Sequence, residues 1–243
     1  MNERICVLNC PIDNIDVNSA LKRVCCAIEN KKNFQIITIN PEMIINAQKN
    51  KEFFNVINSA DLIIPDGIGV KIALQLKGIK IHKIRGIDFS RELIKLSCKK
   101  GLKIGFLGAK EEIIQKAKEN ILNKYKNINI AYVHNGYFDN ENKIIEEIRH
   151  SDVKILLVGM GSPYQEEFIR KLKQTLNGTV MIGVGGSFDV YSGTIKEAPI
   201  FYQKLGLEWM YRTILQPERF GRIFPLLPLF LIKCIINSTM SKD

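Results

Sequence analysis

The sequence lacks the features of a secreted protein and of a protein-built metal site. Its six cysteines form no Cys-x-x-Cys pair, and its first ten residues, MNERICVLNC, lack the long apolar segment of a secretion signal. The three histidines are scattered, and no His-Glu-x-x-His motif or cysteine–histidine cluster has the spacing of metal ligands. We therefore expect a protein of the reducing cytosol with no metal held by protein ligands.

The sequence also lacks a hydrophobic run long enough to cross a membrane. Its most apolar segment, Ile223–Ile236, is shorter than the roughly 20 residues that a crossing helix needs. Pro225, Pro228 and Lys233 interrupt this segment. Two interpretations remain open: a segment that lies in the membrane interface, or a last pair of helices packed on the core.

Acidic residues are in deficit, since 25 Asp+Glu against 35 Lys+Arg leave a net charge of +10. Such a surface attracts phosphates, nucleic acid or acidic lipid headgroups, and the charge alone does not choose among them. Many lysines, such as those between Lys110 and Lys126, accompany glutamates at helical spacing. That pattern is typical of a solvated helix face.

Short β-branched segments alternate with longer amphipathic ones along most of the chain. The alternation predicts an α/β fold with a mostly parallel, Rossmann-like sheet and helices on both faces. The expected strands are Phe34–Ile39, Asp61–Pro65, Lys103–Leu107, Ile128–Val133, Lys154–Val158 and Val180–Val184, and the expected helices are Pro41–Asn58, Asp88–Lys100, Lys110–Tyr125, Asn140–His150 and Pro163–Leu176.

The chain changes character after Pro199. No repeat or linker divides residues 1–199, which we interpret as one compact α/β domain. Beyond it, Phe201–Leu215 has an aromatic and basic helix pattern and precedes the apolar segment. We interpret residues 200–243 as a C-terminal helical appendage that associates with a membrane.

In an open parallel sheet, ligands bind beyond the carboxyl ends of the strands, so the turns after the strands are the candidate sites. Asn40 follows the first predicted strand and suits a helix cap, whereas Thr38 has no such structural reason for its place. Asp66 follows the second strand and is a candidate general base, although an acid before a glycine is more often a turn former.

A lone arginine, Arg85, precedes the next predicted helix. It is a candidate phosphate ligand if it lies near Asp66. Asp88, three residues later, is interpreted as the cap of that helix.

Two glycine-rich turns follow later strands. The first, Gly159 to Glu166, includes Gly161 and Gln165, and the second, Gly183 to Asp189, includes Gly185, Gly186 and an acid suited to grip a ribose or a base. Two such turns at neighbouring strand ends favour a nucleotide ligand. The dinucleotide fingerprint is absent, because Tyr164 stands where its last glycine belongs.

At these residues the chain resembles the WecG/TagA/CpsF family of glycosyltransferases, which includes N-acetylmannosaminyltransferases of teichoic-acid linkage units and of enterobacterial common antigen. The likeness runs nearly end to end. The matching pieces, in the family's order, are Thr38 and Asn40, Pro65 to Gly67, Arg85 to Asp88, Gly159 to Glu166, Gly185 to Asp189, Ala198-Pro199, Leu205 to Arg212 and Pro217 to Arg222.

The resemblance implies roles for individual residues. Asp66 falls on the catalytic base, and Thr38, Asn40 and Gln165 fall on the pocket around the donor sugar and diphosphate, with Arg85 assisting. Asp189 falls where the family holds the uridine. Three residues of the appendage, Arg212, Arg219 and Arg222, fall on arginines that reach the active site. Ile39 departs from close relatives, which often carry proline there.

The implied reaction moves N-acetylmannosamine from UDP-N-acetylmannosamine to the N-acetylglucosamine of a polyprenyl (undecaprenyl) diphosphate-linked acceptor, for a wall teichoic acid linkage unit or a related cell-surface polysaccharide. Such a transfer needs a deprotonated hydroxyl and a neutralised diphosphate, which a carboxylate and arginines supply. Because the chain has no Asp-x-Asp pair to hold a metal, we expect a metal-independent, cofactor-free and inverting transfer.

The implied partners are a UDP-sugar donor, the lipid-linked acceptor and an anionic membrane surface, without nucleic acid. The implied location is cytoplasmic, peripheral on the inner face of the cell membrane. An apolar tail held off the membrane would favour a homo-oligomer. Two alternatives stay open, a NAD-dependent oxidoreductase, which the missing third glycine disfavours, and a non-catalytic, membrane-associated nucleotide-binding protein.

Overall fold

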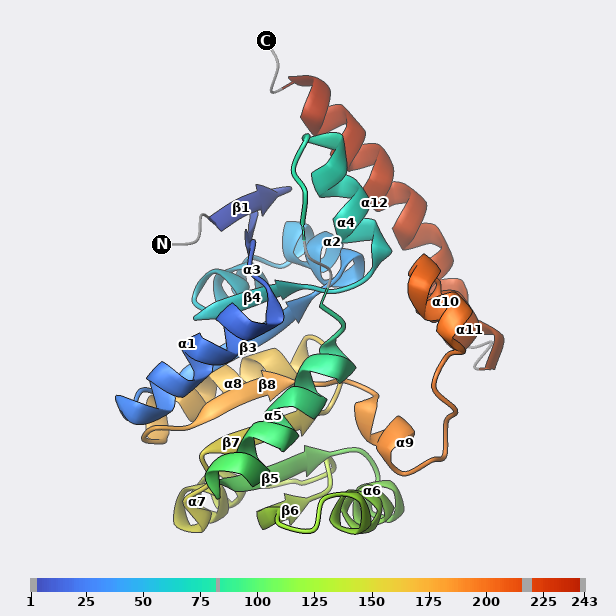
Figure 1. Cartoon of the computed structure of the whole chain (residues 1–243). Coiled ribbons are helices and arrows are strands. Elements are labelled where there is room, and N and C mark those ends of the chain that lie inside the picture. Colours follow the sequence, from blue (N-terminus) through green and yellow to red (C-terminus); the bar gives the residue numbers. More distant parts are fainter. Residues whose placement is uncertain (1–3, 82–83, 216–219, 241–243) are drawn as a thin grey trace.

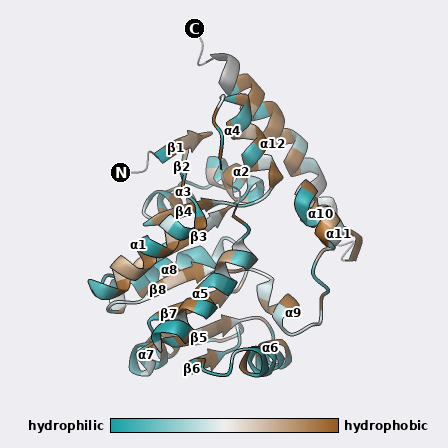
Figure 2. Cartoon of the chain, in the orientation of Figure 1, coloured by the Kyte–Doolittle hydropathy of each residue, from teal (hydrophilic) through white to brown (hydrophobic). Residues whose placement is uncertain are grey.

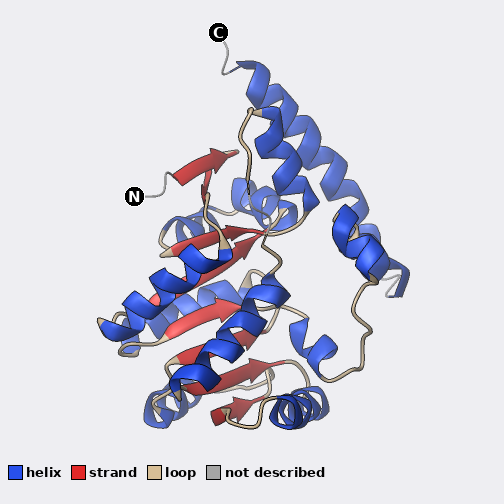
Figure 3. Cartoon of the chain, viewed as in Figure 1, coloured by secondary structure: helices blue, strands red, loops and turns tan. Residues whose placement is uncertain are grey.

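The computed structural model describes residues 4–81, 84–215 and 220–240, without the side chains of 212, 220, 222–224 and 238–240. A six-stranded sheet crosses the middle of the molecule (Figures 1 and 3). Its strands lie in the order β4 (Leu62–Pro65), β3 (Phe34–Ile39), β8 (Val180–Gly183), β7 (Ile155–Gly159), β5 (Lys103–Gly108) and β6 (Asn129–His134). All neighbours in this sheet are parallel, which confirms the predicted α/β class.

Helices cover both faces of the sheet because its strands bury side chains on both sides. One face, which includes Ile36, packs against α1 (Val17–Glu29), α5 (Gly86–Lys100), α6 (Glu111–Lys124) and α9 (Ser187–Tyr191). The other face, which includes Ile37 and Leu156, packs against α2 (Pro41–Lys49), α3 (Lys51–Asn58), α4 (Ile68–Leu76), α7 (Glu141–Ser151), α8 (Tyr164–Thr175) and part of α12 (Phe220–Met240). Alternate residues of a strand point to opposite faces, so neighbours such as Ile36 and Ile37 serve different cores.

Two predicted helices are each divided in the structure. The predicted helix Pro41–Asn58 is α2 and α3, because Asn50 has extended backbone angles and its side chain accepts a hydrogen bond from Phe53 N at 3.0 Å, which begins a new helix. The pattern Phe201–Leu215 is α10 (Ile200–Leu205) and α11 (Glu208–Leu215), because Gly206 takes a left-handed conformation (φ 73°).

A hairpin at the N-terminus was not predicted from the sequence. β1 (Arg4–Val7) pairs antiparallel with β2 (Cys10–Asp13). The buried carboxylate of Asp13 accepts hydrogen bonds from Arg4, Arg23 and Ile63 N, the last at 2.7 Å. The hairpin is therefore fixed to the start of β4 by contacts distant in sequence.

The C-terminal helices pack on the α/β body. Phe230 and Cys234 of α12 are buried in the core with residues of α2 and α4. Gly69 of α4 allows this approach, since a Cβ there would lie 3.0 Å from Leu227 Cδ1. Figure 2 shows apolar residues along much of α12. Among the described residues, no helix combines the length and hydropathy that a membrane crossing requires.

Candidate active site

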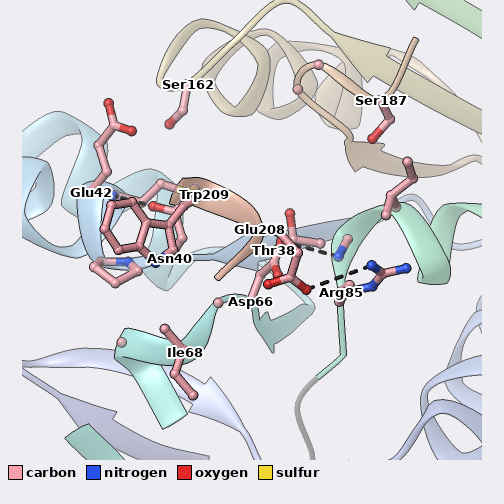
Figure 4. A pocket seen from close by; sticks show the side chains of 18 of the residues that line it. Thr38, Asn40, Glu42, Asp66, Ile68, Arg85, Ser162, Ser187, Glu208 and Trp209 are labelled. Carbon is pink, nitrogen blue, oxygen red and sulfur yellow. Dashed lines mark hydrogen bonds and ion pairs between the residues drawn. The ribbon is translucent and has the colours of Figure 1, made fainter. Parts of the chain in front are cut away.

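A cavity of about 410 Å³ opens at the carboxyl ends of β3, β4 and β8. Its wall is built by turns that follow these strands and β7, by the starts of α2, α4 and α5, and by residues of α11 and α12 (Figure 4). Eight of the residues that the sequence predicted for the site line it: Thr38, Asn40, Asp66, Arg85, Gly161, Gln165, Gly185 and Gly186.

Asp66 is the acid of this wall that the sequence predicted. It follows β4 directly, and its backbone N–H donates to Ile39 O at 2.8 Å, which continues the pairing of the two strands. The side-chain Oδ2 accepts a hydrogen bond from Gly86 N at 3.2 Å, at the start of α5. A carboxylate is thus held at a helix N-terminus, where the helix dipole favours its negative charge.

Thr38 lies beside Asp66 because β3 pairs with β4, and both side chains approach the start of α5 because that helix begins with a glycine. A Cβ on Gly86 would lie 3.2 Å from Thr38 Oγ1 and 3.3 Å from Asp66 Oδ2. The Thr38 hydroxyl donates to Gly183 O at 3.4 Å, across to β8. The ends of three strands are therefore connected through one small cluster.

Asn40 both caps a helix and lines the cavity, so the structure combines the two interpretations of this residue. Its Oδ1 accepts a hydrogen bond from Met43 N at 3.0 Å, so it caps α2. It also lines the cavity. The capping interpretation is confirmed, and any contact with a ligand would involve the rest of the amide.

Arg85 lies next to the candidate base, as its interpretation as a phosphate ligand required, but its guanidinium faces carboxylates. It donates to Asp88 at 2.5 and 2.7 Å and to Glu197 at 2.9 Å, and its Nη1 lies 3.8 Å from Glu208. The hydrogen bonds that Arg85 donates to Asp88, opposed by burial, raise the pKa of Arg85 further, so it is a permanent cation. A phosphate would compete with these acids for its N–H groups.

Asp88 is not the helix cap that the sequence suggested. Arg85 occupies the cap position, and Asp88 lies in the first turn, where it pairs with Arg85 and with Arg91 at 3.1 Å. Glu197, which precedes α10, also pairs with both arginines. Arg91's hydrogen bond, with burial opposing it, holds the pKa of Glu197 below its ordinary value. This network joins the start of α5 to the segment that leads to the C-terminal helices.

Gln165 occupies the first turn of α8 and has both ends of its amide engaged. Its Oε1 accepts a hydrogen bond from Gly185 N at 3.0 Å, and its Nε2 donates to Glu166 Oε1 at 2.6 Å. The Gly161 turn and the Gly185 turn are thereby joined on one side of the cavity.

The four other predicted residues divide into one that lies outside the cavity and three whose side chains the structure does not describe. Asp189 lies in α9 and is not among the lining residues. Arg212 lies in α11 and Arg222 in α12, but their side chains are outside the description, and Arg219 is outside the described residues altogether.

Sequence reasoning also missed residues that line the cavity. They include Glu42 and Met43 of α2, Ser162, Ser187, Glu197, Glu208 and Trp209 of α11, and Leu226 and Leu227 of α12. Glu208 and Trp209 belong to a segment that the sequence marked as similar to the family's appendage, and Ser162 and Ser187 lie within the two predicted glycine-rich turns.

A second cavity, of about 390 Å³, lies at the opposite edge of the sheet. It is lined by Leu102, Val153 and Thr179, which precede β5, β7 and β8. This second cavity is at the amino ends of the strands. Ligands of open parallel sheets bind at the carboxyl ends, so the cavity around Asp66 is the candidate active site.

The sequence comparisons identify the protein family of this chain. The model of the "Glycosyl transferase WecG/TagA/CpsF family" matches residues 5–243. The chain belongs to the WecG/TagA/CpsF family. It is therefore a glycosyltransferase, and the NAD-dependent oxidoreductase and the non-catalytic binding protein are no longer alternatives.

Two members of the WecG/TagA/CpsF family with similar sequences carry the same name. A protein of Bacillus subtilis (strain 168) is 36% identical over 200 residues, which are 82% of this chain and 78% of that protein. A protein of Staphylococcus aureus (strain NCTC 8325 / PS 47) is 36% identical over 209 residues, which are 85% and 82% of the two chains. Both are named N-acetylglucosaminyldiphosphoundecaprenol N-acetyl-beta-D-mannosaminyltransferase.

Proposed function

We propose that this chain transfers N-acetylmannosamine from UDP-N-acetylmannosamine to the N-acetylglucosamine of an undecaprenyl-diphosphate-linked acceptor. The product would serve the wall teichoic acid linkage unit or a related cell-surface polysaccharide. The proposal rests on the name of the two relatives, each 36% identical over most of the chain. The observation that carries it is the Asp66 carboxylate beside Thr38 at the end of two parallel strands, on the wall of a cavity.

In this proposal Asp66 is the general base. It takes the proton of the acceptor hydroxyl, and the hydroxyl oxygen attacks the anomeric carbon of the donor sugar as the bond from that carbon to the diphosphate breaks. UDP leaves with the bonding electrons, and a single displacement inverts the configuration, giving a β-linkage from an α-linked donor. The N–H of Gly86 fixes one carboxylate oxygen and so orients the base.

The leaving diphosphate must be stabilised as its charge grows. We assign this role to Arg85 together with Arg212, Arg219 and Arg222 of the appendage, with backbone N–H groups of the glycine turns around Gly161 and Gly186 assisting. Arginine forks replace a metal ion in this assignment, because the sequence has no Asp-x-Asp pair. Asp189, which lies in α9 just after this glycine turn, is proposed for the uridine.

The membrane assignment rests on the outer face of the C-terminal helices. In α12, Leu229, Ile232, Ile235 and Ile236 are exposed at helical spacing, while Phe230 and Cys234 on the other side are buried. Ile200 and Phe201 of α10 are also exposed, each to 68%. An apolar stripe of this kind suits an interface helix, and the net charge of +10 suits anionic lipid. We therefore propose a cytoplasmic enzyme, peripheral on the inner face of the membrane, and a homo-oligomer when it is off the membrane.

The decisive experiment is product analysis with a panel of UDP-sugars and a short-chain prenyl-diphosphate-N-acetylglucosamine acceptor. We expect a β-linked N-acetylmannosamine product from one donor only, formed equally with and without a chelator. Asp66→Asn should lower turnover at least 100-fold while UDP binding stays within a few fold, because the variant loses the base but not the pocket. Unchanged turnover in Asp66→Asn would remove Asp66 from its role, and loss of activity on chelation would contradict metal independence.

A further inference from the structure

A buried carboxyl group next to the cavity has no task in the mechanism above. The side chain of Glu166 is only 2% exposed, and it does not line the cavity. Its Oε1 accepts the hydrogen bond from Gln165 Nε2 at 2.6 Å, and its Oε2 is buried without a hydrogen-bond partner among the described residues. Burying an acid in this way costs free energy, so its presence calls for a reason.

The neighbouring amide shows what Glu166 does. Gln165 presents its oxygen to Gly185 N and its nitrogen to Glu166 Oε1. If the amide turned over, its NH₂ group would face the Gly185 N–H and its oxygen would face the carboxyl oxygen. Both hydrogen bonds would be lost, because donors would meet donors and acceptors would meet acceptors. Glu166 therefore fixes which end of Gln165 points to Gly185.

β8 has a glycine, Gly183, at the position where Gln165 and Glu166 pack against it. A Cβ on Gly183 would lie 2.5 Å from Gln165 Nε2 and 2.9 Å from Glu166 Oε1. The backbone oxygen of Glu166 also accepts a hydrogen bond from the buried Gln35 at 3.0 Å. Burial, partly offset by the hydrogen bond from Gln165, raises the pKa of Glu166 to about 7, and Oε1 remains an acceptor in either protonation state.

We propose that Glu166 is a positioning residue for the nucleotide donor. Its Oε1 orients Gln165, and Gln165 in turn holds the N–H of Gly185 and with it the wall formed by Gly185, Gly186 and Ser187. This inference rests on the proposed function, since it takes the UDP moiety as the occupant of that wall. Gln165 can then offer the donor its second Nε2 hydrogen and the remaining lone pair of Oε1, since each end of the amide has one partner within the chain.

Three variants of the full chain separate orientation from packing. Glu166→Gln keeps the volume and offers a carbonyl oxygen to Gln165, whereas Glu166→Leu removes the acceptor. Glu167→Leu, one residue further on α8 and not in the cavity wall, is the matched control. We expect Glu166→Leu to raise the Kd for UDP and the KM for the UDP-sugar about tenfold with kcat within threefold, the effect of one lost orienting hydrogen bond. Glu166→Gln and Glu167→Leu should stay within twofold of the unmodified chain.

A ligand-free measurement keeps the inference testable apart from the reaction. In the nitrogen–proton NMR spectrum, the Gly185 amide should shift and exchange faster in Glu166→Leu but not in Glu166→Gln. A Glu166→Leu chain that is folded, binds UDP normally and keeps the Gly185 signal would overturn the proposal, as would an equal loss in Glu166→Gln. If the unmodified chain does not bind UDP, the proposed function fails, and the donor-positioning role fails with it even if the Gly185 signal responds.

Discussion

Gly86 illustrates how much the candidate site depends on single residues. It is the first residue of α5, its N–H holds Asp66, and the absence of a side chain lets Thr38 and Asp66 approach the helix. Two other glycines of the cavity wall act differently: Gly161 and Gly185 have open space at the Cβ position but positive φ angles. A side chain at Gly86 is excluded by lack of space, whereas a side chain at Gly161 or Gly185 is disfavoured by the backbone conformation.

Gly86→Ala is therefore expected to displace Thr38 and Asp66, the proposed catalytic pair, without unfolding the protein. The new Cβ meets Thr38 and Asp66 at 3.2–3.3 Å, so turnover should fall about 10- to 100-fold, because small displacements of reacting groups are costly. The unfolding free energy should change by less than about 1 kcal/mol, since alanine favours the helix. Kinetics and urea unfolding measure both, with the exposed Lys99→Ala of the same helix as the control. Full activity in Gly86→Ala would contradict the crowding argument.

Glu166 should also leave a mark on the pH dependence of stability. Burial raises its pKa from 4.5 to about 7, so between these values the folded chain binds more protons than the unfolded chain. The contribution of Glu166 to the unfolding free energy therefore falls as pH rises from 4.5 through 7, by at most about 3 kcal/mol. Urea unfolding at pH 5 and pH 8 should show a larger loss in the unmodified chain than in Glu166→Gln. Equal losses would place the native pKa near its ordinary value.

At the scale of elements, the alternation of strands and helices could be predicted from the sequence, but the N-terminal hairpin and the breaks within helices could not. Each strand of the large sheet was predicted with ends at most one residue from those observed, because buried parallel strands are continuous β-branched runs. The β1–β2 hairpin was missed because its strands are short and Asp13 secures it through Arg23 and Ile63. The break at Asn50 was missed because the apolar periodicity continues across it.

The last helix behaves as part of the core. Phe230 is fully buried against α2 and α4, so Phe230→Ala should lower the unfolding free energy by about 3–5 kcal/mol. Ile232→Ala, at a position that is 55% exposed, should change it by less than about 0.5 kcal/mol. Urea unfolding measures both. A small effect of Phe230→Ala would mean that the appendage is separable from residues 1–199, as the predicted division at Pro199 assumes.

At the scale of the whole molecule, α12 has exposed apolar residues on one side and also contributes Leu226 and Leu227 to the cavity wall. A membrane bound to the exposed side would therefore lie close to the candidate active site. The triple variant Ile232→Ser, Ile235→Ser, Ile236→Ser should bind phosphatidylglycerol vesicles at least tenfold more weakly, because it removes apolar surface that would enter the interface. Its activity on a short, water-soluble acceptor should be unchanged. Leu122→Ser, on the exposed face of α6, is the control, and equal vesicle binding by both variants would contradict the membrane assignment.

The site was predictable to the extent that parallel strands end at one edge. That rule alone brings together Thr38, Asp66 and Gly185, which come from three separate strand ends. It gives no information on partners from the C-terminal helices, so Glu208 beside Arg85 was not foreseen. Nor does it reveal that Arg85 is surrounded by acids, because Glu197 is distant from it in sequence.

The order of strands in the sheet has a consequence for synthesis on the ribosome. β8 is the last strand to emerge, yet it joins β3 on one side to β7 on the other. Without β8, neither β3 nor β7 has the neighbour that joins the two groups of strands, and each would present an edge with unpaired backbone groups. Thr38 and Asp66 belong to one group and the Gly161 turn to the other, so we expect the cavity wall to be assembled only after β8 has been translated.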